Sequence, residues 1–185
     1  MQRWAVVCLC LTAMVPSAAV ALADSTTQSA TASERLSLRT GVGDGGRRQL
    51  TLMRGAAPLA SVPLPNDLDR ASIDEGLASA VWNDAGTAVA VAFVHPRATC
   101  VVAFLPRDTR EYVGTDISDV EARNVGAIGP FRTYVRRATV PLSWEEWSEG
   151  RRVLRVRTTV WDQAGQRYRG TEALVFSPDG VPFWR

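Results

Sequence analysis

Two short runs of apolar residues restrict the fold of this chain more than any other feature of its sequence. They are AVAVAFV (Ala88–Val94) and CVVAFL (Cys100–Leu105), and a short loop with Pro96 joins them. Apolar residues at every position, rather than at alternate positions, are typical of a strand that is covered on both faces. The two runs therefore predict strands in the middle of a sheet that has further layers on both sides.

Other segments have the pattern of short strands, separated by turns rich in Gly, Asp, Asn and Pro. They are QLTLMR (49–54), LASVPL (59–64), LASAVW (77–82), EYVGTDI (111–117), TYVRRATVPL (133–142), RVLRVRTTVW (152–161), TEALVF (171–176) and VPFW (181–184). About eight to ten such strands predict an all-β antiparallel domain. We expect a two-sheet sandwich or a partial-propeller-like stack of hairpins, with at most one or two short helical turns.

Several local features refine this prediction. The segments 49–54 and 59–64 are separated by a Gly/Pro turn and favour an edge hairpin, in which Pro63 restricts the second strand to the edge of its sheet. Asn66–Gly76 is acidic and rich in turn-forming residues, so we expect a connection there. In Trp144–Gly150 we expect one helical turn, with Ser143 as its N-cap.

The frame Val-Trp-x-x-Ala-Gly occurs twice, as VWNDAG (Val81–Gly86) and as VWDQAG (Val160–Gly165). The residues after the two turns differ: a doubly apolar strand follows the first, and the polar run Gln166–Arg169 follows the second. A duplicated unit would keep its core positions on both sides of the turn. We therefore interpret the echo as one kind of hairpin turn used twice, with Trp82 and Trp161 as packing residues.

The stretch Leu77–Val113 combines a strand that ends in Trp82, an Asn-Asp-x-Gly turn, a buried strand, a loop and a second buried strand. It resembles one blade of a TolB-like or WD-type β-propeller, and FSPDG at Phe176–Gly180 is similar to the turn of such blades. The resemblance implies blade-like four-stranded sheets. It carries over no functional residue, because the blade motif is structural. Propeller blades have about 40–50 residues each, so this chain has room for about three at most.

The first 23 residues have the pattern of a secretory signal peptide. Arg3 precedes an apolar stretch, and Ala21-Leu22-Ala23 is a small-residue site that predicts cleavage after Ala23. A membrane anchor is the alternative, but Pro16 interrupts the apolar run and the run is short for a span. We expect an exported protein, periplasmic or secreted, with residues 24–35 as a flexible polar N-terminus, residues 36–185 as a single all-β domain and no membrane span after cleavage.

The residue types that most enzymes and metal sites need are scarce. There is no lysine, which excludes a Schiff base or a pyridoxal-phosphate site. His95 is the one histidine, and with Cys100 it cannot supply the several ligands of a zinc or copper site. The glycines of GVGDGG (Gly41–Gly46) match a dinucleotide motif, but a strand-like segment follows where a helix is needed. We predict no cofactor and no metal.

Two further features have a structural and a chemical interpretation. Cys100 is expected as a buried small hydrophobe, with a thiol nucleophile or an intermolecular disulfide as the alternative. The carboxylates Asp67, Asp69, Asp74 and Glu75 are clustered, but their spacing does not match the calcium loop of an EF-hand.

A second acidic cluster supports the one enzymatic alternative. Glu145, Glu146 and Glu149 flank Trp144 and Trp147. Paired carboxylates beside aromatic rings are the groups with which a glycoside hydrolase acts, so this cluster makes a carboxylate-based hydrolase of a glycan the alternative function.

Arginines on one strand provide the best candidate for a binding site. Period-2 alternation in residues 152–161 predicts one packed face and one wet face, and the wet face carries Arg155 and Arg157, with Arg136 across the sheet. Guanidinium groups suit phosphate and carboxylate. Residues 123–185 hold 11 arginines against 6 acidic residues, whereas residues 24–122 hold 9 against 13.

These features together predict a non-enzymatic, exported all-β domain with a binding or structural role in the cell envelope. Its partner is a protein or an anionic envelope polymer. A nucleic-acid partner is not expected, because the formal net charge of the whole chain is only +2.

Overall fold

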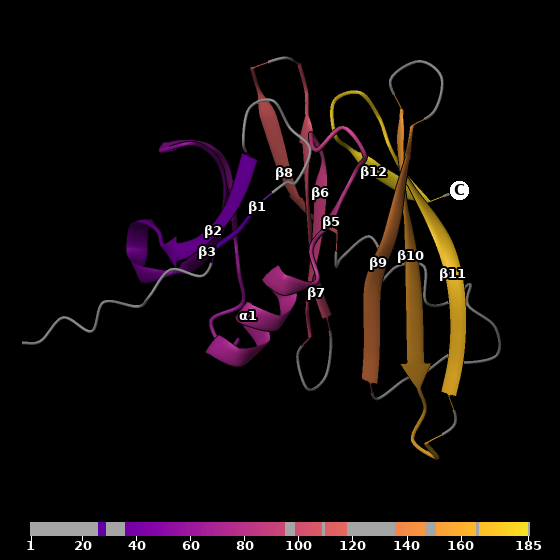
Figure 1. Cartoon of the computed structure of the whole chain (residues 1–185). Coiled ribbons are helices and arrows are strands. Elements are labelled where there is room, and N and C mark those ends of the chain that lie inside the picture. Colours follow the sequence, from indigo (N-terminus) through magenta and orange to yellow (C-terminus); the bar gives the residue numbers. More distant parts are fainter. Residues whose placement is uncertain are drawn as a thin grey trace, which may run out of the picture.

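Twelve strands form three four-stranded antiparallel sheets in the part of the chain that the structure describes (Figure 1). The structure is a computed structural model, and it describes residues 26–28, 36–94, 99–108, 110–117, 136–146, 151–165 and 167–184. In each sheet the strands lie side by side in chain order, and no sheet closes into a barrel. The predicted all-β class is confirmed.

We name the three sheets A, B and C in chain order. Sheet A contains β1 (Thr26–Gln28), β2 (Leu36–Val42), β3 (Arg48–Arg54) and β4 (Ala57–Pro63). Sheet B contains β5 (Val81–Trp82), β6 (Val89–Val94), β7 (Thr99–Pro106) and β8 (Tyr112–Asp116). Sheet C contains β9 (Arg136–Glu146), β10 (Arg152–Trp161), β11 (Arg167–Phe176) and β12 (Pro182–Trp184).

Sheet B is the middle layer of this stack, between sheet A and sheet C (Figure 1). Alternate residues of its central strands β6 and β7 point in opposite directions. Val91, Phe93 and Phe104 belong to the core shared with sheet A, whereas Ala90, Ala92 and Leu105 belong to the core shared with sheet C. The prediction of doubly covered strands is confirmed. Two sheets were our first expectation, and the three layers correspond to the stack of hairpins.

The acidic segment after β4 is a helix for much of its length rather than a turn-rich connection. Helix α1 spans Arg70–Ala78, and the side chain of its N-cap residue Asp69 accepts a hydrogen bond from the backbone N–H of Ser72 at 2.7 Å. Ile73 and Leu77, four residues apart, are buried against β6. The strand expected for Leu77–Trp82 is therefore confined to Val81–Trp82. Capping and apolar spacing outweighed the turn-forming composition of this segment.

Two other expectations change at the ends of strands. Trp144–Glu146 forms the end of β9, where we expected the start of a helical turn, because these residues pair with Arg152, Val153 and Leu154 of β10. Residues 147–150 lie outside the described residues. Thr26–Gln28, within the expected flexible segment, pairs with β2 as an edge strand, since backbone pairing needs no apolar side chains.

The hairpin predicted near the beginning of the domain is present. Strands β3 and β4 pair over Gln49–Arg54 and Ala57–Pro63, and β4 with Pro63 is an edge strand of sheet A. After the glycines of residues 41–46 the chain enters β3 and not an α-helix; Asp44–Gly46 form only a short 3-10 turn. No helix of the described residues is long and apolar enough to cross a membrane.

The two Val-Trp-x-x-Ala-Gly segments form the same turn at different places in the fold. The backbone N–H of Gly86 donates to the carbonyl of Asn83 at 2.9 Å, and that of Gly165 donates to the carbonyl of Asp162 at 3.2 Å. Both glycines have positive φ angles, 64° and 77°, which other residues rarely adopt. The first turn joins the first two strands of sheet B, and the second joins the middle strands of sheet C. The interpretation as repeated turn chemistry is confirmed.

Candidate functional site

The outer face of sheet C, which points away from sheet B, is the candidate binding site. Leu154 and Val156 of β10 are fully buried in the core shared with sheet B. Because side chains alternate along a strand, Arg155 and Arg157 point to the opposite face. The predicted packed face is confirmed. The predicted wet face is exposed only in part, because Val153 and Thr159, which lie on it, are 0% and 8% exposed.

Arg155 is held by an acidic residue of the neighbouring strand. Its Nε and Nη2 atoms donate to the two carboxylate oxygens of Glu145 at 2.9 Å and 3.3 Å. This hydrogen bonding, together with the negative charge of Glu145, raises the pKa of Arg155. The two side chains are 40% and 41% exposed. A bidentate pair of this kind leaves Arg155 less available to an external anion.

Arg157 lies on the same face, and the position of Arg136 in β9 is not directly across from Arg155 or Arg157. The strand register pairs Arg136 with Trp161, and pairs Arg157 with Val140. Arg157 is exposed. Trp161 is four positions after Arg157 along β10, so Arg136 and Arg157 lie in different rows of the sheet. For Arg136 the structure describes only the position in β9.

Two further arginines lie on this face, and the sequence analysis did not select them. Trp161 pairs with Arg167 of β11, and Thr159 pairs with Arg169. Directly paired residues share one face of a sheet, so both arginines lie on the outer face, and both are exposed. We call the positions Arg136, Arg157, Arg167 and Arg169 the cationic end of sheet C. The signal in the sequence was the alternation of Arg167 and Arg169 within RYRG, the run that we took only as polar.

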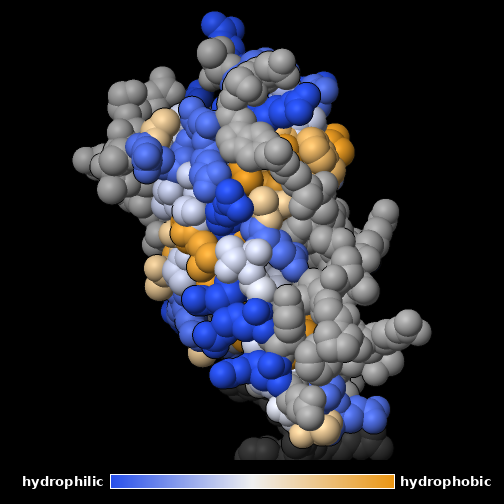
Figure 2. Space-filling model, turned by 90° about the vertical axis from the view of Figure 1, so that its right-hand side faces the viewer, coloured by the Kyte–Doolittle hydropathy of each residue, from blue (hydrophilic) through white to orange (hydrophobic). Residues whose placement is uncertain are grey.

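The described rows of the cationic end contain no acidic residue, although Asp162 lies in the turn directly after them. The three rows also hold Ala138, Val140, Thr159, Thr171 and Trp161. Glu172 pairs with Val156 and therefore belongs to the opposite face, and Asp162 is half-buried in the turn after Trp161. Figure 2 shows hydrophilic residues over the lower part of the side of the molecule on which sheet C lies. The described arginines here are thus not matched by acidic residues on their own face.

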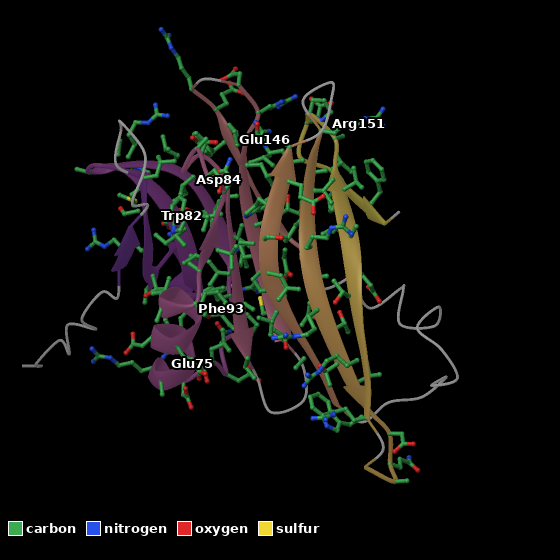
Figure 3. All side chains as sticks on the ribbon, turned by 45° about the vertical axis from the view of Figure 1, so that its right-hand side comes forward. Glu75, Trp82, Asp84, Phe93, Glu146 and Arg151 are labelled. Atoms are coloured by element: carbon green, nitrogen blue, oxygen red, sulfur yellow. The ribbon has the colours of Figure 1, made fainter. Side chains whose placement is uncertain are left out.

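The glutamates proposed for a hydrolase are separated by the sheet. Glu145 and Glu146 are consecutive residues of β9, so their side chains point to opposite faces. Glu145 contacts Arg155 on the outer face, whereas Glu146 Oε1 accepts a hydrogen bond from Asn83 Nδ2 at 3.4 Å. In Figure 3, Glu146 lies at the same end of the molecule as Asp84, the residue after Asn83. The two carboxylates do not face one substrate together, and Glu149 lies outside the described residues.

The contact between Asn83 and Glu146 is one of the hydrogen bonds that join sheet B to the end of β9 in sheet C. Asn83 Oδ1 accepts from the backbone N–H groups of Thr87 and Ala88 at 2.7 Å and 2.8 Å. Beside it, the indole N–H of Trp144 donates to the carbonyl of Val81 at 3.0 Å. These contacts account for the tryptophan and glutamate of the acidic cluster as packing and hydrogen-bonding residues of the interface.

The remaining candidates have structural surroundings. Cys100 is 5% exposed in the core between sheets A and B, and its Sγ lies 4.0 Å from Asp116 Oδ2. This is the buried position that the sequence favoured. In the acidic cluster after β4, Asp69 caps α1, and Asp74 pairs with Arg70 at 3.6 Å. The described residues contain no group of three or more His, Cys, Asp or Glu side chains that could hold a metal ion. His95 lies outside these residues.

Comparison with known proteins adds no further assignment. No protein-family model, curated protein or solved structure matches this chain. Any functional conclusion therefore depends on the residues of the chain itself and on their arrangement.

Proposed function

We propose that this protein is an exported, non-enzymatic all-β domain that binds an anionic polymer or an acidic protein partner of the cell envelope. The binding surface is the cationic end of sheet C. One observation carries this proposal: the strand register gathers Arg157, Arg167, Arg169 and the position of Arg136 on one face, in rows that hold no acidic residue.

The physical basis is the combination of exposure and unbalanced charge. Exposed guanidinium groups can form bidentate hydrogen bonds to carboxylate or phosphate without first leaving a buried environment. Several like charges on one face also raise the local concentration of an oppositely charged ligand, and this attraction weakens as salt is added. The paired strands of the sheet hold the backbone of these arginines in place, which limits the entropy lost when a ligand binds.

Retention on a cation-exchange matrix tests this surface. The triple variant Arg157→Ala, Arg167→Ala and Arg169→Ala should elute at clearly lower salt than the unchanged protein. The matched control replaces the exposed Arg47, Arg70 and Arg110 with alanine, which removes the same charge from other elements. Equal losses for the two triple variants would mean that only total charge matters, and the cationic end would not be a site.

Export is the second part of the proposal and has its own test. The supporting features are Arg3, the apolar stretch after it and the small residues that end at Ala23. Protein recovered from the cell envelope or the medium should begin at Asp24 when its terminus is sequenced. Full-length chain found only in the cytoplasm would contradict export and, with it, an envelope partner.

We also propose that the sheets are relatives of propeller blades. The resemblance in Leu77–Val113 falls on sheet B and on the end of the helix before it, and each of the three sheets consists of four consecutive antiparallel strands. Four consecutive antiparallel strands are the usual form of such a blade. The proposal concerns descent and fold only, since the blade pattern assigns no ligand.

A further inference from the structure

The cationic end of sheet C surrounds an aromatic side chain, and this arrangement points to a particular class of anion. Arg136, Trp161 and Arg167 form one row across β9, β10 and β11. Neighbouring strands lie about 4.7–4.9 Å apart, so the two arginine positions are roughly 10 Å apart with the indole between them. Arg169 and Arg157 lie one and two rows further along the sheet, at steps of about 7 Å.

The surface around this indole is built from small side chains. Ala138 and Thr159 occupy the adjoining row and Thr171 the row after it. Thr159 is only 8% exposed, and Trp161 itself is half-buried. A sheet face with one half-buried aromatic ring and several exposed cations is suited to an extended ligand that lies across the strands. A ligand with a single charge would contact one arginine and leave the others in solvent.

We propose that the cationic end binds an acidic polysaccharide, a polymer of uronic acids or of sulfated or phosphorylated sugars. The ring of Trp161 packs against the apolar C–H face of a sugar ring, as aromatic side chains do in contacts with amphipathic ligands. Arg157, Arg167 and Arg169, which are exposed, pair with the acidic groups of that sugar and of its neighbours along the chain. This inference rests on the proposed function and specifies its ligand.

The repeat of charges in such a polymer explains why several arginines are arranged in rows. Each guanidinium–carboxylate contact at a solvent-exposed surface is weak by itself. Once one contact has formed, the next acidic group of the same chain is already close to the next arginine, so the contacts reinforce one another. Arg155 is excluded from this set, because Glu145 already occupies its guanidinium group.

A membrane surface fits the arrangement less well. Val181 and Phe183 are the large exposed apolar residues of β12 and the turn before it, at 61% and 43% exposure. Phe183 lies in the row of Val175 and Val153. Val153 is eight residues from Trp161, or roughly 27 Å along β10. Binding to a lipid surface usually places several inserting apolar residues beside the cations. Here Leu142 of β9, 39% exposed, is near the row of Arg157, whereas Val181 and Phe183 lie towards the opposite end of the sheet.

A single-stranded nucleic acid is the other polyanion that uses stacking on aromatic rings. Proteins of that class normally carry a larger excess of positive charge than this chain, whose formal net charge is +2. This ligand is therefore a competitor in the experiment below and not the proposed partner.

The experiment measures binding of the full mature chain to polygalacturonate by affinity electrophoresis and by titration calorimetry. Phosphatidylglycerol vesicles, a thymidine oligonucleotide and neutral dextran serve as competitors. The unchanged protein should bind polygalacturonate more tightly than it binds the vesicles or the oligonucleotide, and it should not bind dextran. Trp161→Ala should weaken binding to polygalacturonate roughly 3- to 10-fold and leave retention on the cation-exchange matrix unchanged. Trp161→Tyr keeps a flat ring and should restore most of the affinity; it also separates loss of contact from loss of folding.

The outcomes distinguish this inference from the function on which it rests. If Trp161→Ala is folded and binds polygalacturonate as tightly as the unchanged protein, the sugar contact is wrong, although an anion-binding face remains. If vesicles or the oligonucleotide bind more tightly than polygalacturonate, the ligand class is wrong. If the triple arginine variant keeps full retention on the cation-exchange matrix, the proposed function itself fails.

Discussion

The two faces of sheet B differ in the size of the side chains that they present to their neighbours. Towards sheet A, the cross-strand pair Val89 and Phe104 fills the space between the layers. Towards sheet C, the adjacent pair is Ala90 and Ala103. All four residues are completely buried. At these pairs the middle sheet therefore presents large side chains to the core shared with sheet A and small side chains to the core shared with sheet C.

The difference shows how one sheet can hold two unlike layers. In the core between sheets B and C, the large residues come mainly from sheet C, as Leu154, Leu174, Phe176 and the half-buried Trp144, with Leu105 of β7 and Ile117 after β8 added to them. The ring centroids of Trp144 and Phe176 are 5.7 Å apart. In the core between sheets A and B, helix α1 also contributes Ile73 and Leu77. On sheet B, truncation of a large side chain should thus destabilise the core shared with sheet A. Enlargement of a small side chain should destabilise the core shared with sheet C.

Truncation of Phe104 to alanine is the strongest test of the core between sheets A and B. Removing a fully buried phenylalanine ring loses its burial and leaves a cavity. We expect Phe104→Ala to lower the free energy of unfolding by about 3–5 kcal/mol, measured by urea denaturation. Phe183→Ala is the matched control, because Phe183 is 43% exposed. Equal costs at the two positions would contradict the assigned core.

Enlargement of Ala103 tests the opposite face of the same sheet. A leucine there must fit against residues of sheet C that already fill the space, and overpacking of this kind costs about 1–3 kcal/mol. Urea denaturation of Ala103→Leu measures the cost. Ala57→Leu, at an exposed position of β4, serves as the control. If Ala103→Leu leaves stability unchanged, the core between sheets B and C has unfilled space.

The sequence predicts this contrast in part. Continuous apolar runs predicted that β6 and β7 are covered on both faces, because only a middle strand places every side chain in a core. The sizes of the residues on each face were also visible once the strand was assumed. Which segments form the covering layers was not predicted, since the pattern within a strand says only that a face is covered and not which sheet covers it. Helix α1 was missed because short capped helices carry little periodic signal.

The candidate site was predicted less completely than the fold. Alternation in β10 placed Arg155 and Arg157 on one face without knowledge of the neighbouring strands. The pairing of Arg155 with Glu145, and the positions of Arg167 and Arg169, depend on the register between strands. Register follows from contacts that are distant in the sequence, so a reading of one strand at a time could not supply it.

Trp144→Phe tests one hydrogen bond between sheets B and C. The substitution keeps an aromatic ring but removes the indole N–H that donates to the carbonyl of Val81. We expect a cost of about 1–2 kcal/mol in the free energy of unfolding, because the carbonyl loses its partner. Trp82→Phe is the matched control, since the buried Trp82 Nε1 has no hydrogen-bond partner among the described residues. A larger cost at Trp82 than at Trp144 would show that ring size, and not the hydrogen bond, decides.

The smallest expected effect concerns α1, which is present only on the side of sheet B that faces sheet A. The backbone N–H of Ser72 donates to the side chain of Asp69, and this hydrogen bond lowers the pKa of Asp69. A carboxyl whose pKa is lower in the folded protein adds stability above its unfolded pKa, near pH 4. That contribution disappears as the pH falls through the folded pKa.

Asp69→Asn separates the charge of this cap from its hydrogen bond. Asparagine is also a good N-cap residue, so the helix keeps its cap and loses the favourable charge at its N-terminus. We expect the variant to melt slightly below the unchanged protein at about pH 7, and this difference to be smaller at acidic pH, as Asp69 becomes protonated. Asp84→Asn, at an exposed turn outside the helix, controls for the loss of one negative charge. A difference in melting temperature between Asp69→Asn and the unchanged protein that is the same at neutral and at acidic pH would assign the effect to cap geometry, and the acid sensitivity of the core between sheets A and B would then have another source.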